Sequence, residues 1–179
     1  MTELVPFRRD DAGELAQLLS GEQWPFHSGP PTTPAAVLEQ VAAGHYDGET
    51  TRTWWVVRDG ERVGVVRAWD VGDGTPLFDL RLRAAARGRG AGGEVVRLVT
   101  RALFEDQPDL ARIEATTRQD NAAMRRALRR GGYVKEAHYR QDWPGQDGAT
   151  HDAVGYAILR RDWSTGSTTP VDWHDEPTP

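Results

Sequence analysis

The segment RGRGAGG, residues 87–93, places four glycines and two arginines between a strand-like run and a helix-like run. Glycine lets the backbone pass close to a ligand because it has no side chain to obstruct the approach. The helix that follows directs its free N–H groups and the positive end of its dipole toward the same place. The segment therefore predicts a site for an anion such as a diphosphate, with Arg87 and Arg89 adding positive charge.

Gly88, Gly90 and Gly93 also match the G-x-G-x-x-G fingerprint of dinucleotide-binding proteins. In those proteins an apolar parallel strand ends directly at the first glycine, near the start of a βαβ unit. Here the preceding run is half charged, residues 84–87 separate it from the loop, and about eighty residues come before it. A plain flexible turn would not explain why arginines alternate with the glycines. We therefore favour a phosphate site over an NAD site.

The length of 179 residues and the hydrophobic content of 38% predict one domain with a real core. We place that domain at residues 1–163 and expect residues 164–179, which have little apolar content, to form a disordered tail. The absence of cysteine excludes disulfides and thiolate metal sites and favours a cytoplasmic setting. We expect no membrane role, since no apolar run is long enough to span a bilayer, and no bound metal.

The formal net charge of -5 argues against a general nucleic-acid binder, which usually presents a broad basic face. The charge is uneven, because arginines crowd residues 81–101 and 125–130 while the first fifty residues are acidic or neutral. This distribution fits a small polyanionic ligand. Lys135 is the single lysine among 22 basic residues, which together with abundant alanine and glycine indicates a GC-rich bacterial genome.

Hydrophobic periodicity predicts an α/β chain with two N-terminal helices, a hairpin, two strand–helix units and a final hairpin. Asp59 and Gly60 predict the first hairpin turn, with Glu61 as an extra loop residue. The predicted strands are 4–7, 53–58, 62–69, 77–83, 112–117, 133–143 and 153–160, and the predicted helices begin near Asp10, Pro34, Gly93 and Asn121.

The strand before the glycine segment alternates in character. Phe78, Leu80 and Leu82 are expected to face a core, whereas Asp79 and Arg81 point the other way, because successive strand side chains lie on opposite faces.

The spacing Arg87-x-x-Gly90-x-Gly92 is similar to the [Q/R]-x-x-G-x-[G/A] signature of the GNAT superfamily of acetyl-CoA-dependent N-acetyltransferases. The signature lies between a predicted strand and a predicted helix, where that family has it.

Two further stretches strengthen the resemblance. Residues 121–140, NAAMRRALRRGGYVKEAHYR, resemble the family's Asn-initiated helix that ends in a glycine–aromatic pair. Residues 151–163, HDAVGYAILRRDW, resemble the end of the branch that includes ribosomal-protein alanine N-acetyltransferases. The matches cover about residues 56–163 in the family's order, which is more specific than any one motif.

The resemblance implies an α/β GNAT-like fold, a mixed sheet of about seven strands whose two central parallel strands splay apart to admit acetyl-CoA. Backbone of the first of these strands would pair with the pantetheine arm, and the glycine loop would hold the pyrophosphate. For Arg126, an adenosine phosphate contact and a solvated helix face remain open alternatives. The cofactor-binding residues so implied are Leu80, Arg81, Leu82, Arg87, Gly88, Arg89, Gly90, Ala91, Gly92, Asn121 and Arg126.

In this family an amine attacks the thioester directly, so a base is needed to deprotonate the ammonium. Asp79 is our first candidate base, with pairing to Arg81 or Arg83 as the structural alternative, and His27 is a second candidate. Asn121 is also counted among the catalytic candidates. Many relatives place a tyrosine acid at the position that Leu128 occupies here, which puts thiolate protonation in question.

The acceptor side is less determined by the sequence. Trp24, Phe26 and His27 lie on a proline-rich loop that would overhang the acceptor, and Tyr139 on a later strand would line it. The acceptor is an amine, either a protein N-terminus or a small molecule. A non-catalytic acyl-CoA-binding module is the alternative function, and a homodimer is one open possibility for assembly.

Overall fold

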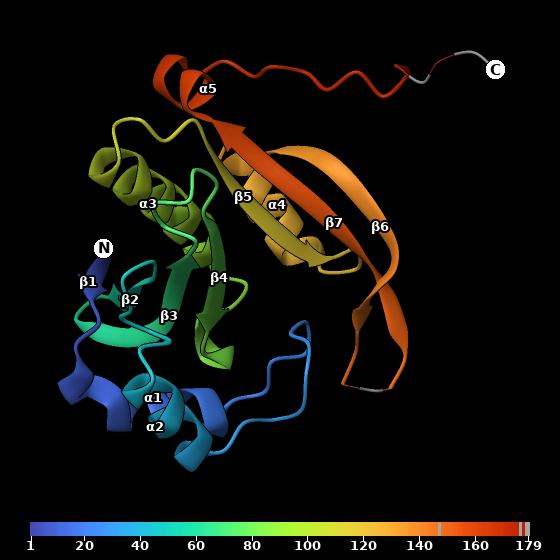
Figure 1. Cartoon of the computed structure of the whole chain (residues 1–179). Helices are drawn as coiled ribbons and strands as arrows, with labels where there is room; N and C mark the ends of the chain where they lie inside the picture. Colours follow the sequence, from blue (N-terminus) through green and yellow to red (C-terminus); the bar gives the residue numbers. More distant parts are fainter. Residues whose placement is uncertain (147, 176, 178–179) are drawn as a thin grey trace.

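The computed structural model describes residues 1–146, 148–175 and 177, and in this part of the chain a seven-stranded mixed sheet carries helices on both faces (Figure 1). The sheet order is β1-β2-β3-β4-β5-β7-β6, and the β4–β5 neighbours are parallel whereas the other pairs are antiparallel. The strands are β1 (Thr2–Pro6), β2 (Arg52–Arg58), β3 (Glu61–Trp69), β4 (Leu77–Leu82), β5 (Arg112–Arg118), β6 (Val134–Pro144) and β7 (Thr150–Leu159). The helices are α1 (Ala12–Gly21), α2 (Pro34–Ala42), α3 (Ala91–Asp106), α4 (Ala122–Arg130) and α5 (Arg160–Thr165). The predicted fold is confirmed.

The β2–β3 hairpin is tighter than expected. Asp59 and Gly60 both have positive φ, 52° and 86°, as a two-residue type I′ turn requires. Arg58 pairs directly with Glu61, so the prediction of an extra loop residue at Glu61 was wrong. The twist of a type I′ turn matches that of the strands, so the turn needs no additional loop residue.

The two faces of the sheet are covered by different helices. Helices α3 and α4 bury one face with side chains that include Val95, Val99 and Leu103, while α1 and α2 cover the β1–β3 half of the other face. Helix α3 is amphipathic as predicted. It begins at Ala91, two residues earlier than Gly93, because Gly90 takes the N-cap position.

Helix α5 spans the predicted domain end at residue 163. Trp163 packs on Phe104 with ring centroids 5.0 Å apart. The buried Asp162 carboxylate accepts hydrogen bonds from the N–H (2.8 Å) and the hydroxyl (2.7 Å) of Thr169. These two bonds tie the chain at Thr169 to Asp162, while the domain end at residue 163 and the disorder of residues 164–179 stay predictions. Glu176 and residues 178–179 of that tail lie outside the described part of the chain.

Strands β4 and β5 are neighbours at one end only. Leu77 pairs with Glu114, and the Glu114 N–H donates to the Pro76 carbonyl at 2.9 Å. Beyond this point the two strands diverge, with α4 behind the gap (Figure 1). The later part of β4 therefore has a partner strand on its β3 side but none on its β5 side, and the predicted splay of the central strands is confirmed.

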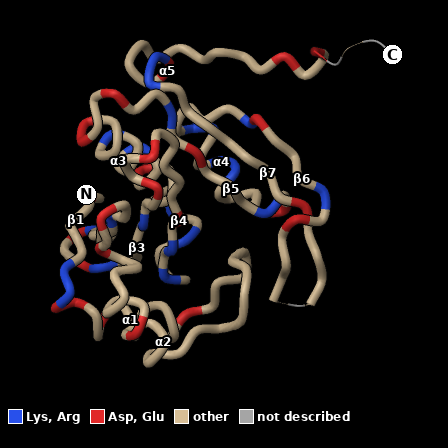
Figure 2. The backbone as a smooth tube through the Cα atoms, in the orientation of Figure 1, with Lys and Arg blue, Asp and Glu red and all other residues tan. Residues whose placement is uncertain are grey.

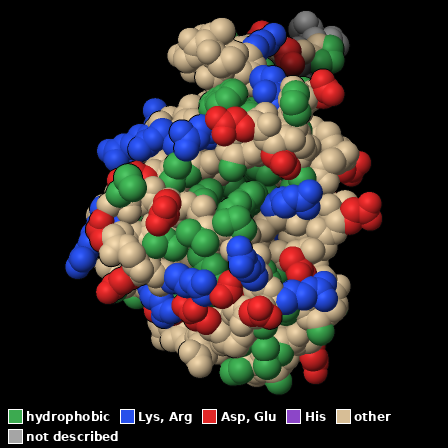
Figure 3. Space-filling model, turned by 90° about the vertical axis from the view of Figure 1, so that its left-hand side faces the viewer, with side chains coloured by type: hydrophobic (Ala, Val, Ile, Leu, Met, Phe, Trp, Pro, Cys, Tyr) green, Lys and Arg blue, Asp and Glu red, His purple; other side chains and the backbone are tan. Residues whose placement is uncertain are grey.

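Charged residues are unevenly distributed over this framework. Basic residues lie along β3 and β4 beside the gap (Figure 2). The face shown in Figure 3 carries acidic and basic side chains interspersed around a hydrophobic area. No helix among the described residues combines the length and apolar character that crossing a membrane requires.

Candidate active site

The divergence of β4 and β5 opens a cavity of about 360 Å³, called the strand cleft below. Its walls are the later part of β4, the glycine loop before α3, the end of β5, the first turns of α4 and the loop at residues 24–27. The cleft therefore gathers most of the sequence-predicted site residues in one place.

The glycine loop forms one end of the strand cleft. Gly88 and Gly90 have φ of 75° and 84°, a left-handed conformation that residues with a side chain adopt at a cost. Among the described residues, no acceptor is found for the backbone N–H groups of residues 88–92, whereas the N–H of Gly93 bonds to Gly90. Unpaired amides at a helix start are a ready site for an anion, so this loop fits a diphosphate.

The two arginines of the glycine loop, Arg87 and Arg89, lie in different places. Arg87 lines the cleft, but its Nε donates to the Leu82 carbonyl and its Nη2 to the Gln23 carbonyl, both at 2.8 Å. It therefore braces the glycine loop against β4 and the loop after α1. The side chain of Arg89 and the buried Ala91 do not line the cleft.

Helix α4 supplies two further arginines that line the cleft and have no described ion-pair partner. Arg126 is one of them, as the resemblance implied, and Arg130 one turn later is another. Sequence reasoning missed Arg130, although its i+4 spacing from Arg126 places both on one helix face.

Asn121 opens α4 on the wall opposite β4. Its Oδ1 accepts from the N–H of Met124 at 3.2 Å and caps the helix, while its Nδ2 donates to Thr117 Oγ1 at 3.0 Å. Leu80, Arg81 and Leu82 line the facing wall. The side chain of Asn121 thus fixes the geometry of the wall and leaves the Thr117 hydroxyl hydrogen available to the cleft.

His27 and Asp79 meet at the other end of the cleft, although 52 residues separate them. His27 Nε2 lies 2.8 Å from Asp79 Oδ1, and Arg81 Nε donates to Asp79 Oδ2 at 2.8 Å. Burial acts to raise the pKa of Asp79, but the charges and hydrogen bonds of His27 and Arg81 outweigh it and hold that pKa well below its ordinary value. Such a carboxylate is a weak proton acceptor.

The other ring nitrogen of His27 is differently placed. His27 Nδ1 is buried and has no hydrogen-bond partner among the described residues. The ring packs edge-on against Trp24, with centroids 5.9 Å apart, and Trp24 is fixed by its Nε1 donating to the Leu19 carbonyl at 2.8 Å. The imidazole is therefore held in orientation while one nitrogen remains unbonded.

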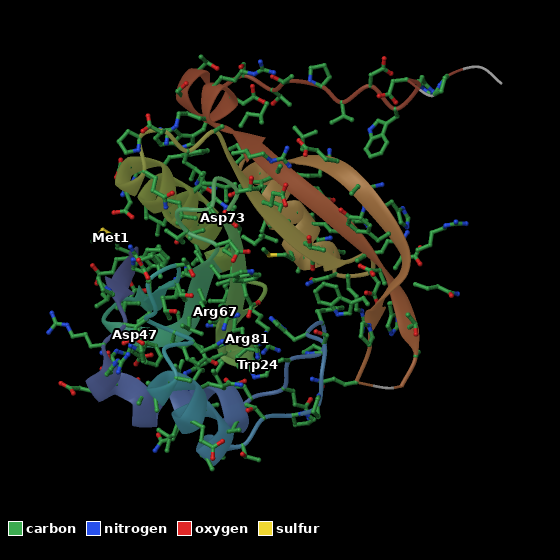
Figure 4. All side chains as sticks on the ribbon, in the orientation of Figure 1. Met1, Trp24, Asp47, Arg67, Asp73 and Arg81 are labelled. Atoms are coloured by element: carbon green, nitrogen blue, oxygen red, sulfur yellow. The ribbon has the colours of Figure 1, made fainter. Side chains whose placement is uncertain are left out.

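A second cavity of about 420 Å³ lies on the far side of this group, between α2, β3 and the β6–β7 connection. Trp24, His27, Asp79 and Arg81 line both cavities and form the boundary between them. Figure 4 shows Trp24, Arg81 and Arg67 of β3 close to one another near this boundary. The arrangement provides two adjoining sites that meet at His27.

The remaining predicted acceptor residues are only partly brought together. Phe26 lines the strand cleft and carries the Arg118 guanidinium 5.2 Å from its ring centre. Tyr139 lines neither cavity and is 48% exposed. Strand β6 changes register between Tyr139 and Trp143, and Trp143 lines the cleft instead. A bulge of this kind is not readable from alternation alone.

Other candidates have different partners or positions. Glu114 on β5 accepts a hydrogen bond from Arg112 Nη2 at 2.6 Å. Leu128 is fully buried in the core rather than at the cleft, and the hydroxyl of Tyr133 bonds to Thr100 inside that core. No tyrosine is among the described residues that line the strand cleft. Within the same described part of the chain, no group of acidic or histidine side chains could hold a metal ion.

A gap between splayed parallel strands, with unpaired amides at a helix start on one end, defines the fold class of acyl-CoA-dependent N-acetyltransferases. The sequence profile of the family described as "Acetyltransferase (GNAT) domain" matches residues 2–134. The chain belongs to this family and is an acetyltransferase by its domain. A comparison with curated protein sequences gives no significant match.

Solved structures with the same fold include three enzymes with different acceptors. Spermidine N-acetyltransferase from Vibrio cholerae, in complex with coenzyme A and spermine, is 16% identical with a TM-score of 0.79, over 91% of this chain and 98% of that one. A ribosomal-protein α-N-acetyltransferase in complex with coenzyme A is 18% identical with a TM-score of 0.77, over 88% and 93%. An aminoglycoside acetyltransferase in complex with coenzyme A is 20% identical with a TM-score of 0.74, over 92% and 98%. Identities this low establish the fold and do not select an acceptor.

Proposed function

We propose that this protein transfers the acetyl group of acetyl-CoA to a primary amine. The observation that carries the proposal is the position of His27 and Asp79, which lie where the strand cleft meets a second cavity. A donor in the cleft and an acceptor in the cavity would then meet beside one oriented imidazole. The solved relatives with bound coenzyme A support the choice of donor.

The strand cleft has the groups that this donor requires. Acetyl-CoA supplies an acetyl group activated as a thioester. The unpaired amides of residues 88–92 are assigned to the diphosphate, and Arg126 and Arg130 to the remaining phosphate charge. The unpaired edge of β4 offers backbone groups to the amide-containing arm, as an added strand would use them.

His27 is assigned as the proton acceptor and Asp79 as the residue that positions it. With the His27 Nε2 hydrogen donated to Asp79, the imidazole is fixed in the tautomer whose Nδ1 carries a lone pair. That nitrogen is buried, so it takes the proton from an attacking amine, as in other histidine–carboxylate pairs, only when movement of the loop at residues 24–27 exposes it. Asp79 itself was our first candidate base, but its lowered pKa favours this supporting role.

The absence of a tyrosine at Leu128 does not prevent turnover. A cysteine thiol has a reference pKa of about 8.5, which is about one to two units above neutral pH. Each unit corresponds to about 1.4 kcal/mol in favour of the protonated thiol, so water can protonate the departed thiolate without a dedicated acid. The Thr117 hydroxyl can donate a hydrogen bond in the cleft meanwhile.

His27→Gln tests the assignment. We expect its kcat to fall by about 10²–10⁴-fold, while its affinity for coenzyme A, measured by calorimetry, stays close to that of the wild type. His138→Gln is the matched control, because His138 also bonds an aspartate, Asp152 at 2.7 Å, but lines neither cavity. Equal kcat values for wild type and His27→Gln would remove His27 from the chemistry.

The alternative is an acyl-CoA-binding module without turnover, which the buried leucine at position 128 favours. Thiol release from acetyl-CoA, measured with a panel of primary amines, separates the two. Tight coenzyme A binding with no thiol release on any acceptor would support the module. A cytoplasmic setting and a homodimer stay predictions beside this proposal.

A further inference from the structure

The second cavity holds an arginine that makes no direct ion pair among the described residues. Arg67 lines this cavity from β3, partly buried between the rings of Tyr46 and Trp69, whose centres lie 5.5 and 5.1 Å from its guanidinium carbon. Its one described hydrogen bond goes from Nη1 to Nε2 of His45. Arg67 forms no ion pair with any residue that the structure describes.

The histidine contact does not neutralise this charge. An imidazole is either uncharged or cationic, so it cannot supply a negative charge, and burial and the charge of Arg67 both lower the pKa of His45. A guanidinium keeps its proton at any physiological pH. A partly buried cation without a direct ion pair is costly, so such a group in a cavity can receive an anionic ligand.

The acid nearest to Arg67 in the sheet is already engaged. Asp79 lies opposite Arg67 in the β3–β4 pairing, but both of its oxygens are used, one by His27 and one by Arg81. Asp79 is the sole acid among the described residues that line the cavity, which also include two arginines. The described lining therefore has an excess of positive charge at the Arg67 end.

We propose that the acceptor is a primary amine that also carries an acidic group, with the acid paired to Arg67 and the amine at His27. This inference rests on the proposed function in treating the cavity as the acceptor side. Opposed residues of an antiparallel pair have Cα atoms about 4.5–5.5 Å apart, so Arg67 and the Asp79-bound imidazole of His27 lie within the reach of a small molecule. Polyamines and aminoglycosides, which carry several positive charges, are disfavoured by the same arginines.

Matched substrate pairs test the charge requirement. Glycine, β-alanine and γ-aminobutyrate are each compared with the corresponding amide, which keeps the amine and removes the negative charge. Two C-terminally amidated peptides, Ala-Asp-Ala and Ala-Asn-Ala, distinguish an acidic peptide N-terminus from a free amino acid, and spermidine is the cationic comparison. The wild type should use at least one acid with a kcat/KM about tenfold to hundredfold above its amide, the range expected for a charged hydrogen bond.

Arg67→Gln should abolish that preference, so that each acid and its amide are used with similar kcat/KM. Arg67→Lys, which keeps the charge, should retain part of the preference and covers the case in which the glutamine variant does not fold. Arg101→Gln is the control, because Arg101 is exposed on α3 and lines neither cavity. The inference would be overturned if the wild type used acids and amides equally or preferred spermidine. It would also be overturned if both Arg67 variants lost kcat/KM equally on acids and amides.

Binding without turnover keeps this inference separate from the proposed function. The acids and amides are also titrated into the protein and followed by calorimetry. Binding of an acid but not its amide, lost in Arg67→Gln, would support the inference even if no amine were acetylated, and the failure would then belong to the proposed function. If acids and amides bound equally and were also acetylated equally, the inference would be contradicted while the proposed function would stand.

Discussion

Replacement of Asp79 by asparagine tests the buried network on which the site depends. The side chain is 27% exposed and makes two hydrogen bonds of 2.8 Å, to His27 and Arg81. Hydrogen bonds to a charged group contribute about 1.5–3 kcal/mol each and neutral ones about 0.5–1.5 kcal/mol. Asparagine keeps the shape and loses the charge, so the free energy of unfolding should fall by about 2–3 kcal/mol. For a chain of this length that corresponds to about 5–10 °C in Tm.

The difference in the free energy of unfolding between the wild type and Asp79→Asn should decrease as the pH falls. The ordinary pKa of an aspartate is about 3.9, and in the folded protein the pKa of Asp79 is lower. Its contribution is therefore complete above about pH 5 and is lost as the pH falls through the folded-state pKa. Below about pH 4 the difference in the free energy of unfolding between the wild type and Asp79→Asn should decrease by about 1.4 kcal/mol per pH unit.

Urea unfolding of both proteins between pH 5.5 and pH 3 measures this gap. Asp120→Asn is the control, because Asp120 pairs with Arg118 at 2.6 Å but is 55% exposed, and its loss should cost less than about 1 kcal/mol. A gap that stays constant down to pH 3, or an Asp79→Asn protein as stable as the wild type, would refute the reasoning.

Two further predictions concern packing next to the site. Gly131→Ala should lower the free energy of unfolding by about 1–3 kcal/mol, because the added Cβ would meet Val96 Cγ1 at 2.6 Å, whereas Gly13→Ala, with open space around it, should not destabilise the fold in the same urea assay. Tyr133→Phe should cost about 1 kcal/mol at neutral pH by removing the hydrogen bond to Thr100. Since burial raises the pKa of Tyr133, its contribution is present below about pH 10 and lost as the pH rises further, so the gap between Tyr133→Phe and wild type should shrink in alkaline unfolding experiments.

Much of the strand cleft could be predicted because its determinants are local. The glycine loop, the Asn121 cap and the alternation of β4 each depend on residues a few positions apart, and propensities and spacing describe such features directly. Phe78 and Leu80 accordingly pack toward the core shared with α3, while Asp79 lies at the boundary of the two cavities.

The second cavity could not be predicted to the same depth because its contacts are distant in sequence. His27 reaches Asp79 only through the path of the proline-rich loop, and Arg67 lies opposite Asp79 only through the register that the connection between β3 and β4 imposes. The bulge in β6 replaces Tyr139 by Trp143 at the cleft. Each of these outcomes depends on tertiary geometry that periodicity does not encode.

Strand β4 explains how one short segment serves both sites. Its period of two sends Leu80 and Leu82 toward the core and Asp79 and Arg81 toward the second cavity, while its unpaired edge faces the strand cleft. A parallel neighbour along its full length would close that edge, and a one-residue slip against β3 would move Asp79 away from Arg67 and His27. The register with β3 and the early divergence from β5 are therefore jointly required, so variants that alter either should affect donor binding and acceptor selection together.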